Sequence, residues 1–201
     1  MNGIYCLEGI WDEDLREKSS VKPILELLHS NKDIKFIYHN CATVEEIEFY
    51  VGKWTQKKYC KFPILYFAFH GEKNKLLLGN KKPYSLDNLA EHLAGKCSNS
   101  IIIFGSCSTL AIRMNYLKKI LDKTGALAIG GYQADVDWLH STAFEMLILS
   151  QMQENEFSKR GISAIESKVN NIVRKFRNEL QFRMVTSKEL NVKNDKAKCE
   201  Y

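Results

Sequence analysis

The sequence is poor in several features that mark particular classes of protein. It has 3 prolines in 201 residues, with no Ser/Gly-rich linker and no internal repeat. Such a composition argues against linker-joined, disordered or solenoid organisation. It also lacks a run of about 18 apolar residues, the length that crosses a membrane. Its first residues include Glu8, Asp12, Glu13 and Asp14, where a secretory signal needs a basic start and an apolar stretch. We therefore expect a cytoplasmic protein without a membrane partner.

Paired metal-binding or disulfide-forming cysteines are also missing. The six cysteines show no Cys-x-x-Cys pairs and no histidines at zinc spacing. We expect no metal and no cofactor, and we expect most thiols to be buried small hydrophobes in a reducing compartment. The cysteines are Cys6, Cys41, Cys60, Cys97, Cys107 and Cys199.

The net positive charge comes from one part of the chain. The formal net charge is +5, yet residues 158–201 hold 11 Lys/Arg against 5 Asp/Glu, whereas residues 1–157 hold 18 against 19. The basic segment lacks the interleaved exposed aromatics of a nucleic-acid platform. A nucleic-acid partner is therefore compatible with this segment but is not implied by it.

The order of apolar patterns predicts a single α/β domain. At 45% hydrophobic residues the chain can bury one sizeable core. Short β-prone runs alternate with helical patterns, which is typical of βαβ units on a parallel sheet. We expect strands at 3–7, 34–39, 63–69, 101–104 and 126–130, and a hairpin at 75–79. We expect helices at 23–29, 43–54, 86–94, from 108 or 109 to 121, 138–152 and 162–180.

These elements predict a three-layer α/β/α domain. Its mostly parallel sheet should have the flavodoxin-like strand order 2-1-3-4-5, with helices on both faces. Residues 1–157 would form the core and residues 158–186 an amphipathic helix packed on that core. Residues 187–201 would form a disordered basic tail.

Two expected strands end in reactive side chains. His70 follows the third strand and Cys107 follows the fourth, and the carboxyl ends of parallel strands meet at one edge of a sheet. A nucleophile and a base would then be in reach of one another. A helix that begins near Ser108 or Thr109 would also favour the thiolate form of Cys107. The pair predicts nucleophilic catalysis by a thiol.

The motifs around this pair resemble those of a known family. A strand ending in His70-Gly71 is followed, about 35 residues later, by one ending in Gly105-Ser106-Cys107. This arrangement resembles the clan CD cysteine peptidases, which include caspases, metacaspases and separase, and most closely the bacterial CHAT-type domains.

The resemblance extends from residue 3 to about residue 152. Residues 124–132 and the acidic loop at 135–138 are similar to the segments that follow the cysteine in CHAT and separase domains. The resemblance thus implies a caspase-like fold and a cysteine endopeptidase acting on a protein or peptide substrate. By analogy with CHAT-type proteins it also suggests a role in bacterial defence.

The resemblance assigns a role to each residue of the site. The thiolate of Cys107 would attack a peptide carbonyl, and His70 would protonate the leaving amine. The N–H groups of Gly71 and Cys107 would form the oxyanion hole. Gly105 and Ser106 would contact the substrate, and no third catalytic side chain is needed.

Two aspartates after the fifth expected strand bear on specificity. The resemblance places the wall of the primary specificity pocket there, so Asp135 and Asp137 predict cleavage after Lys or Arg. Asp137 alternatively caps the helix that starts near Trp138. The caspase Gln-Ala-Cys signature is absent, so acidic specificity is not supported. The connection at residues 123–125 is short, which favours control by a partner protein over cleavage of a linker.

Two other functions fit parts of the sequence. Cys107 and Arg113 have the Cys-x5-Arg spacing of protein phosphatases, although Leu110 and Met114 keep step with a helical apolar stripe. A catalytically silent caspase-like interaction module is the other alternative.

Overall fold

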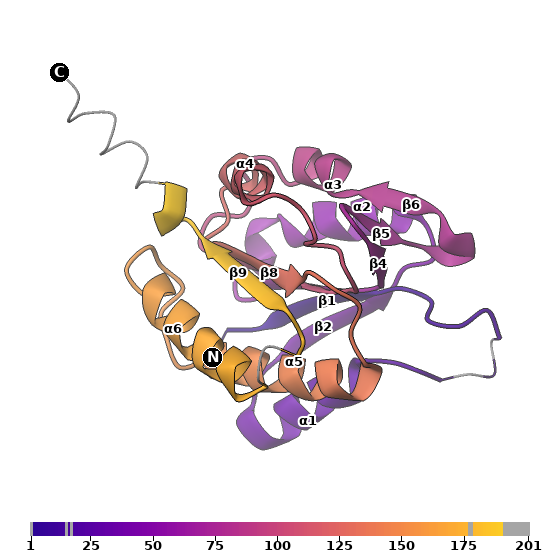
Figure 1. Ribbon diagram of the computed structural model, residues 1–201, viewed down its shortest axis with the longest axis horizontal. Coiled ribbons are helices and arrows are strands. Elements are labelled where there is room, and N and C mark those ends of the chain that lie inside the picture. Colours follow the sequence, from indigo (N-terminus) through magenta and orange to yellow (C-terminus); the bar gives the residue numbers. More distant parts are fainter. Residues whose placement is uncertain (1, 15, 17, 177–178, 191–201) are drawn as a thin grey trace.

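The computed structural model is built around a twisted sheet with helices on both faces (Figure 1). The structure describes residues 2–14, 16, 18–176 and 179–190. The strands of the main sheet are β1 Ile4–Glu8, β2 Phe36–Asn40, β3 Ile64–Ala68, β7 Ile101–Gly105, β8 Ala128–Tyr132 and β9 Phe182–Thr186. A smaller antiparallel sheet holds β4 His70–Glu72, β5 Lys75–Leu77 and β6 Pro83–Ser85.

The helices form a layer on each face of the main sheet. They are α1 Lys22–Lys32, α2 Val44–Trp54, α3 Leu86–His92, α4 Met114–Thr124, α5 Trp138–Met152 and α6 Ile162–Lys175, with short 3-10 turns η1 Lys57–Tyr59 and η2 Gly79–Lys81. One core cluster joins the sheet to α2, α3 and α4, and a second joins it to α1, α5 and α6 (Figure 1). This is the expected three-layer α/β/α arrangement.

The central strands are apolar throughout because both of their faces are covered. Successive side chains of β3 point to opposite faces, so Leu65 and Phe67 enter the first cluster while Ile64 and Tyr66 enter the second. All five residues of β3 are buried. A near-continuous apolar run is therefore the expected sequence of such a strand.

The strand order confirms the predicted fold. The sheet runs β2-β1-β3-β7-β8-β9, and the first five strands are parallel and in the order expected from the sequence. The helix α2 begins as predicted, with Thr43 accepting from the Glu46 N–H while the Glu46 carboxylate accepts from the Thr43 N–H.

The C-terminal part of the prediction needs correction. The helix α6 ends at Lys175, and β9 follows it and pairs antiparallel with β8, so a helix does not extend through 158–186. Of the expected tail at 187–201, residues 191–201 lie outside the described residues. The first tail residues contact the domain, since Lys118 Nζ lies 3.2 Å from the Glu189 carboxylate and Leu190 packs on the core.

The helix after Cys107 also begins later than expected. The helix α4 starts at Met114 with Arg113 as its N-cap, and the preceding loop includes Ser108 at a φ of 53°. The N-terminus of α4, the helix that follows Cys107 in the sequence, therefore does not lie beside it. Within the described residues, no helix is both long and apolar enough to span a membrane.

Candidate active site

The two predicted catalytic residues leave the sheet from neighbouring strands. The parallel strands β3 and β7 pair along their length, with Ala68 opposite Gly105 at the carboxyl end. His70 lies two residues beyond Ala68, and Cys107 lies two residues beyond Gly105. The register of the sheet therefore brings both residues to one edge.

Close packing between the start of β4 and the segment that carries Ser106 and Cys107 explains the glycine after His70. A Cβ built on Gly71 would lie 2.5 Å from the carbonyl oxygen of Cys107 and 2.9 Å from the Cβ of Ser106. A side chain at this position would push these two segments apart. Gly71 therefore allows the backbone beside the histidine to touch the backbone beside the cysteine.

His70 and Cys107 line one cavity of about 210 Å³. Its wall also includes Gly105 and Ser106, two residues that the sequence assigned to substrate contact. A larger hollow of about 710 Å³ lies beside α4 and residues 187–190, but its lining has no cysteine or histidine. The smaller cavity is therefore the candidate active site.

The imidazole of His70 is held by the backbone of Trp11. Its Nε2 lies 2.7 Å from the carbonyl oxygen of Trp11, and the two rings meet edge to face at 5.2 Å. A carbonyl oxygen accepts only, so Nε2 carries the proton and Nδ1 of the neutral ring is left as an acceptor. The ring is thus set up to take a proton at Nδ1.

A buried carboxylate anchors the loop that carries Trp11. Glu8, at the end of β1, accepts from the Trp11 indole N–H at 2.6 Å, the Val21 N–H at 2.7 Å and the Ser20 hydroxyl at 2.6 Å. The hydroxyl of Tyr38 also donates to it. These contacts hold both ends of the loop against the sheet.

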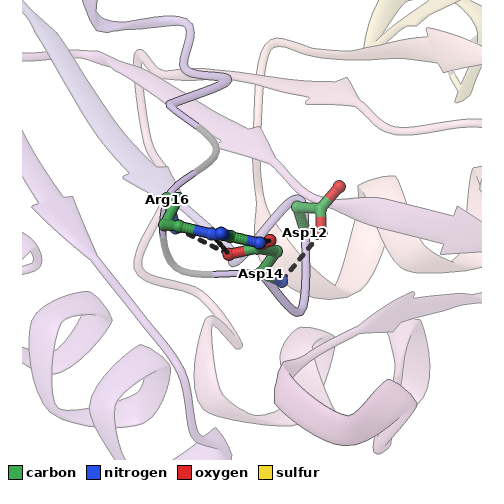
Figure 2. A network of polar contacts seen from close by, with 3 residues as sticks. All are labelled: Asp12, Asp14 and Arg16. Atoms are coloured by element: carbon green, nitrogen blue, oxygen red, sulfur yellow. Dashed lines mark hydrogen bonds and ion pairs between the residues drawn. The ribbon is translucent and has the colours of Figure 1, made fainter.

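The outer turn of the same loop is closed by exposed charges. The Asp12 carboxylate accepts from the N–H of Asp14, and the Asp14 carboxylate pairs with Arg16 at 2.5 Å (Figure 2). The hydrogen bonds from Arg16 lower the pKa of Asp14. Because both partners are exposed, this pair shapes the turn more than it stabilises the fold.

The surroundings of Cys107 favour the protonated form of its thiol. Burial raises its pKa above the ordinary value, and the nearby Asp135 and Glu145 raise it further. Its Sγ lies 3.9 Å from the carbonyl oxygen of Val136, to which the thiol donates. The thiolate expected from a helix N-terminus is therefore not supported, and a base must remove the proton.

The loop after Cys107 is pinned through its own backbone. The N–H of Ser108 donates to Ala134, and the N–H of Leu110 donates to Tyr132. A phosphate-binding loop needs such N–H groups free and turned inward. The Cys-x5-Arg spacing is thus not accompanied by a phosphate cradle.

The structure separates the two candidate specificity residues. Asp137 is the N-cap of α5 and accepts from the His140 N–H at 2.9 Å, as its alternative interpretation predicted. Asp135 accepts from the Ser108 hydroxyl at 2.8 Å, beside the loop of Cys107. Neither aspartate lines the cavity, whereas Val136 between them does.

Comparison with protein-family profiles shows which family the chain belongs to. Residues 1–197 match the profile described as "Family of unknown function (DUF6642)". The chain belongs to this family. No protein of curated function matches the sequence.

The fold of this DUF6642 chain is that of a caspase. It is similar to the crystal structure of caspase-1 from Spodoptera frugiperda, with a TM-score of 0.55 and 14% sequence identity, over 92% of this chain and 86% of that chain. At this identity the likeness concerns the fold alone.

Several residues of the DUF6642 site were not expected from the sequence. Trp11 and Trp138 meet edge to face at 4.5 Å and form part of the cavity wall, together with Tyr132. Glu145 of α5 also lines the cavity and is 3% exposed. Glu145 is the one acidic residue of α5 and lies within its apolar middle, between Ala143-Phe144 and Met146-Leu147. A single acidic residue within an apolar stretch was the sequence feature that could have identified Glu145 as a site residue.

Proposed function

We propose that this protein is a cysteine endopeptidase that uses His70 and Cys107 as its catalytic dyad. The single observation that supports this most is that both residues follow adjacent parallel strands and line the same cavity. Fold similarity alone does not distinguish an enzyme from an inactive relative, so the proposal rests on this placement.

The reaction would follow from the protonation states of the dyad. His70 Nδ1 takes the Sγ proton as the sulfur attacks the substrate carbonyl carbon, because burial favours the protonated thiol. The N–H groups of Gly71 and Cys107 would hold the oxyanion. The imidazolium then gives its proton to the leaving amine, and water hydrolyses the thioester with His70 as base.

The finer features of the proposal concern specificity and control. We expect cleavage after a basic residue, which the carboxylate of Asp135 beside the Cys107 loop favours. We also expect a regulatory protein partner, because the short connection at residues 123–125 leaves no linker whose cleavage could activate the chain. A cytoplasmic location, a CHAT-type relationship and a role in bacterial defence belong to the same proposal.

Labelling with an irreversible peptidyl electrophile tests the dyad. Cys60 is exposed and Cys199 lies outside the described residues, so both are first replaced by serine. Mass mapping should then find the label on Cys107, because Cys6, Cys41 and Cys97 are buried with raised pKa values.

The matched variant in this experiment is His70→Ala. Loss of the base should slow labelling of Cys107 by roughly 10²- to 10⁴-fold, while His92→Ala, at a partly exposed position on α3 that does not line the cavity, should not change it. Labelling that is independent of His70 would exclude the dyad.

A catalytically silent interaction module is the second candidate. The observation in its favour is the raised pKa of the half-buried Cys107 thiol, which donates to Val136. In that case no peptidyl electrophile should modify Cys107, even though iodoacetamide reaches it.

A further inference from the structure

The floor of the cavity is made by a carboxyl group from the opposite helix. Glu145 projects from α5 towards the carboxyl ends of the central strands, where Tyr66 of β3 and Tyr132 of β8 both donate their hydroxyls to it. The Tyr132 bond measures 2.8 Å. Each carboxyl oxygen of Glu145 thus accepts one hydrogen bond, Oε2 from Tyr66 and Oε1 from Tyr132, and both tyrosines are fully buried.

The strand that leads to Cys107 is shaped to admit this carboxyl group. A Cβ built on Gly105 would lie 2.9 Å from Oε2 of Glu145 and 2.8 Å from the ring of Tyr66. Only glycine at this position leaves room for the carboxyl group against the backbone. The Glu145 carboxyl group therefore packs against the backbone of Gly105, two residues before the nucleophile.

This buried acid has no cation to neutralise it within the described part of the chain. Its hydrogen bonds come from two neutral hydroxyls, and burial raises its pKa to about 7. An unpaired buried carboxylate is unfavourable unless a positive charge reaches it. The cavity supplies a route, because Glu145 lines it together with Cys107.

The remaining wall suits the stem of a long cationic side chain. Trp11, Val136 and Trp138 present apolar surface around the cavity, and Ser141 and Thr142 of α5 also line it. Lysine and arginine bury their methylene stems on such surface while the charged head seeks an acceptor. Apolar walls over an acidic floor are complementary to this kind of side chain.

We propose that Glu145 is the specificity-determining residue of the site and that it binds the Lys or Arg side chain of a peptide cleaved by Cys107. The proposal rests on the proposed peptidase function. It places recognition of the basic side chain at Glu145 on the cavity floor instead of at Asp135, which lies at the cavity rim. Asp135 is already bonded to Ser108 and lies outside the cavity lining, so it contributes to the local potential and not to the contact.

The test compares two peptidyl electrophiles that differ only at P1, one with lysine and one with neutral norleucine of similar length. The rate at which each labels Cys107 is measured in the background with Cys60 and Cys199 replaced by serine. A charge-assisted bond to Glu145 should make the lysine probe faster by roughly ten- to a hundredfold. Glu145→Gln should bring the two rates together.

Two matched variants test whether the preference for lysine depends on Glu145, on Asp135, or on the loss of any partly buried carboxyl group. Asp135→Ala should keep the preference for lysine. So should Glu166→Gln, which alters a half-buried carboxyl group on α6, away from the cavity. Since Glu145 raises the pKa of Cys107, the rate with iodoacetamide, which needs no P1 contact, is measured for each variant and used to correct both probe rates for a change in thiol reactivity.

Each other result is decisive. If the unaltered site labels with both probes at the same rate, the assignment of Glu145 is overturned while the dyad stands, and this comparison needs no variant to fold. If Asp135→Ala removes the preference and Glu145→Gln keeps it, recognition occurs at the rim. If neither peptidyl probe labels Cys107, the proposed function itself fails.

Discussion

At the scale of single residues, two buried glutamates at the same edge of the sheet have different surroundings. Glu8 accepts hydrogen bonds from four donors, one of which is a backbone N–H. Glu145 accepts from two tyrosine hydroxyls and faces the cavity. A fully bonded carboxylate fixes structure, whereas one with spare capacity beside a cavity can bind a ligand.

We predict that Glu8→Gln weakens both the fold and the dyad. An amide offers one acceptor oxygen in place of two, so at least one buried donor loses its partner, at a cost of about 1 to 3 kcal/mol. The Trp11 loop, which holds His70 through its carbonyl, should then move. Chemical denaturation should show lower stability, and peptidyl labelling of Cys107 should slow.

The control for this prediction lies in the same loop. Glu13 is exposed, so Glu13→Gln should leave stability and labelling unchanged. A Glu8→Gln protein that labels Cys107 at the full rate would show that the loop does not position His70.

The placement of His70 and Cys107 at one edge of the sheet could be predicted from the sequence, but their surroundings could not, for a physical reason. His70 and Cys107 were predictable because each directly follows an apolar strand, and parallel strands end at one edge. Trp11 and Glu145 reach the site through a long loop and from a helix on the far side of the cavity. Such contacts depend on packing between distant segments, which local periodicity does not encode.

At the scale of elements, β9 supports the cysteine loop. Arg183 on this strand donates to the carbonyl oxygens of Leu110 and Ile112, the latter at 3.0 Å. The strand was missed because Phe176 and Leu180 continue the helical apolar spacing of α6, and five residues give little alternation. The late start of α4 has a similar origin, since Leu110 keeps helical spacing but packs in a loop against β8.

We predict that Arg183→Met loosens the loop after Cys107. Methionine keeps much of the apolar stem but removes both donors, at a cost of about 1 to 3 kcal/mol for charged hydrogen bonds. Hydrogen exchange of the amides at 108–112 should accelerate, and the melting temperature should fall. Arg174→Met, on the exposed face of α6, should change neither, and equal effects from the two variants would contradict the role given to β9.

At the scale of the whole molecule, the sheet divides the interior into two apolar clusters, and the site lies at one end of the sheet. The strand order was predictable because apolar runs and helices alternate along the chain, and such βαβ units build parallel sheets with few allowed orders. Glu145 is the exception within its cluster. It is an ionisable group that is 3% exposed and bonded by two neutral tyrosine hydroxyls, so its titration should be visible in the stability of the entire fold.

We predict that global stability depends on pH through Glu145. Burial raises its pKa in the folded protein to about 7, whereas in the unfolded chain it stays near 4.5. Between these two values the folded state holds a proton that the unfolded state releases, so the free energy of unfolding falls as pH rises through this window. The groups around it do not compensate, because Tyr66, Tyr132 and Cys6 have raised pKa values and stay neutral there.

Denaturation of the unaltered protein and of Glu145→Gln at pH 5 and pH 8 measures this effect. Since one pKa unit corresponds to about 1.4 kcal/mol, the variant should gain about 1 to 3 kcal/mol relative to the unaltered protein between the two pH values. Glu13→Gln should show no such gain. A difference that is the same at both pH values would mean that Glu145 is ionised at pH 5 inside the fold, and that the cavity floor already carries a permanent negative charge.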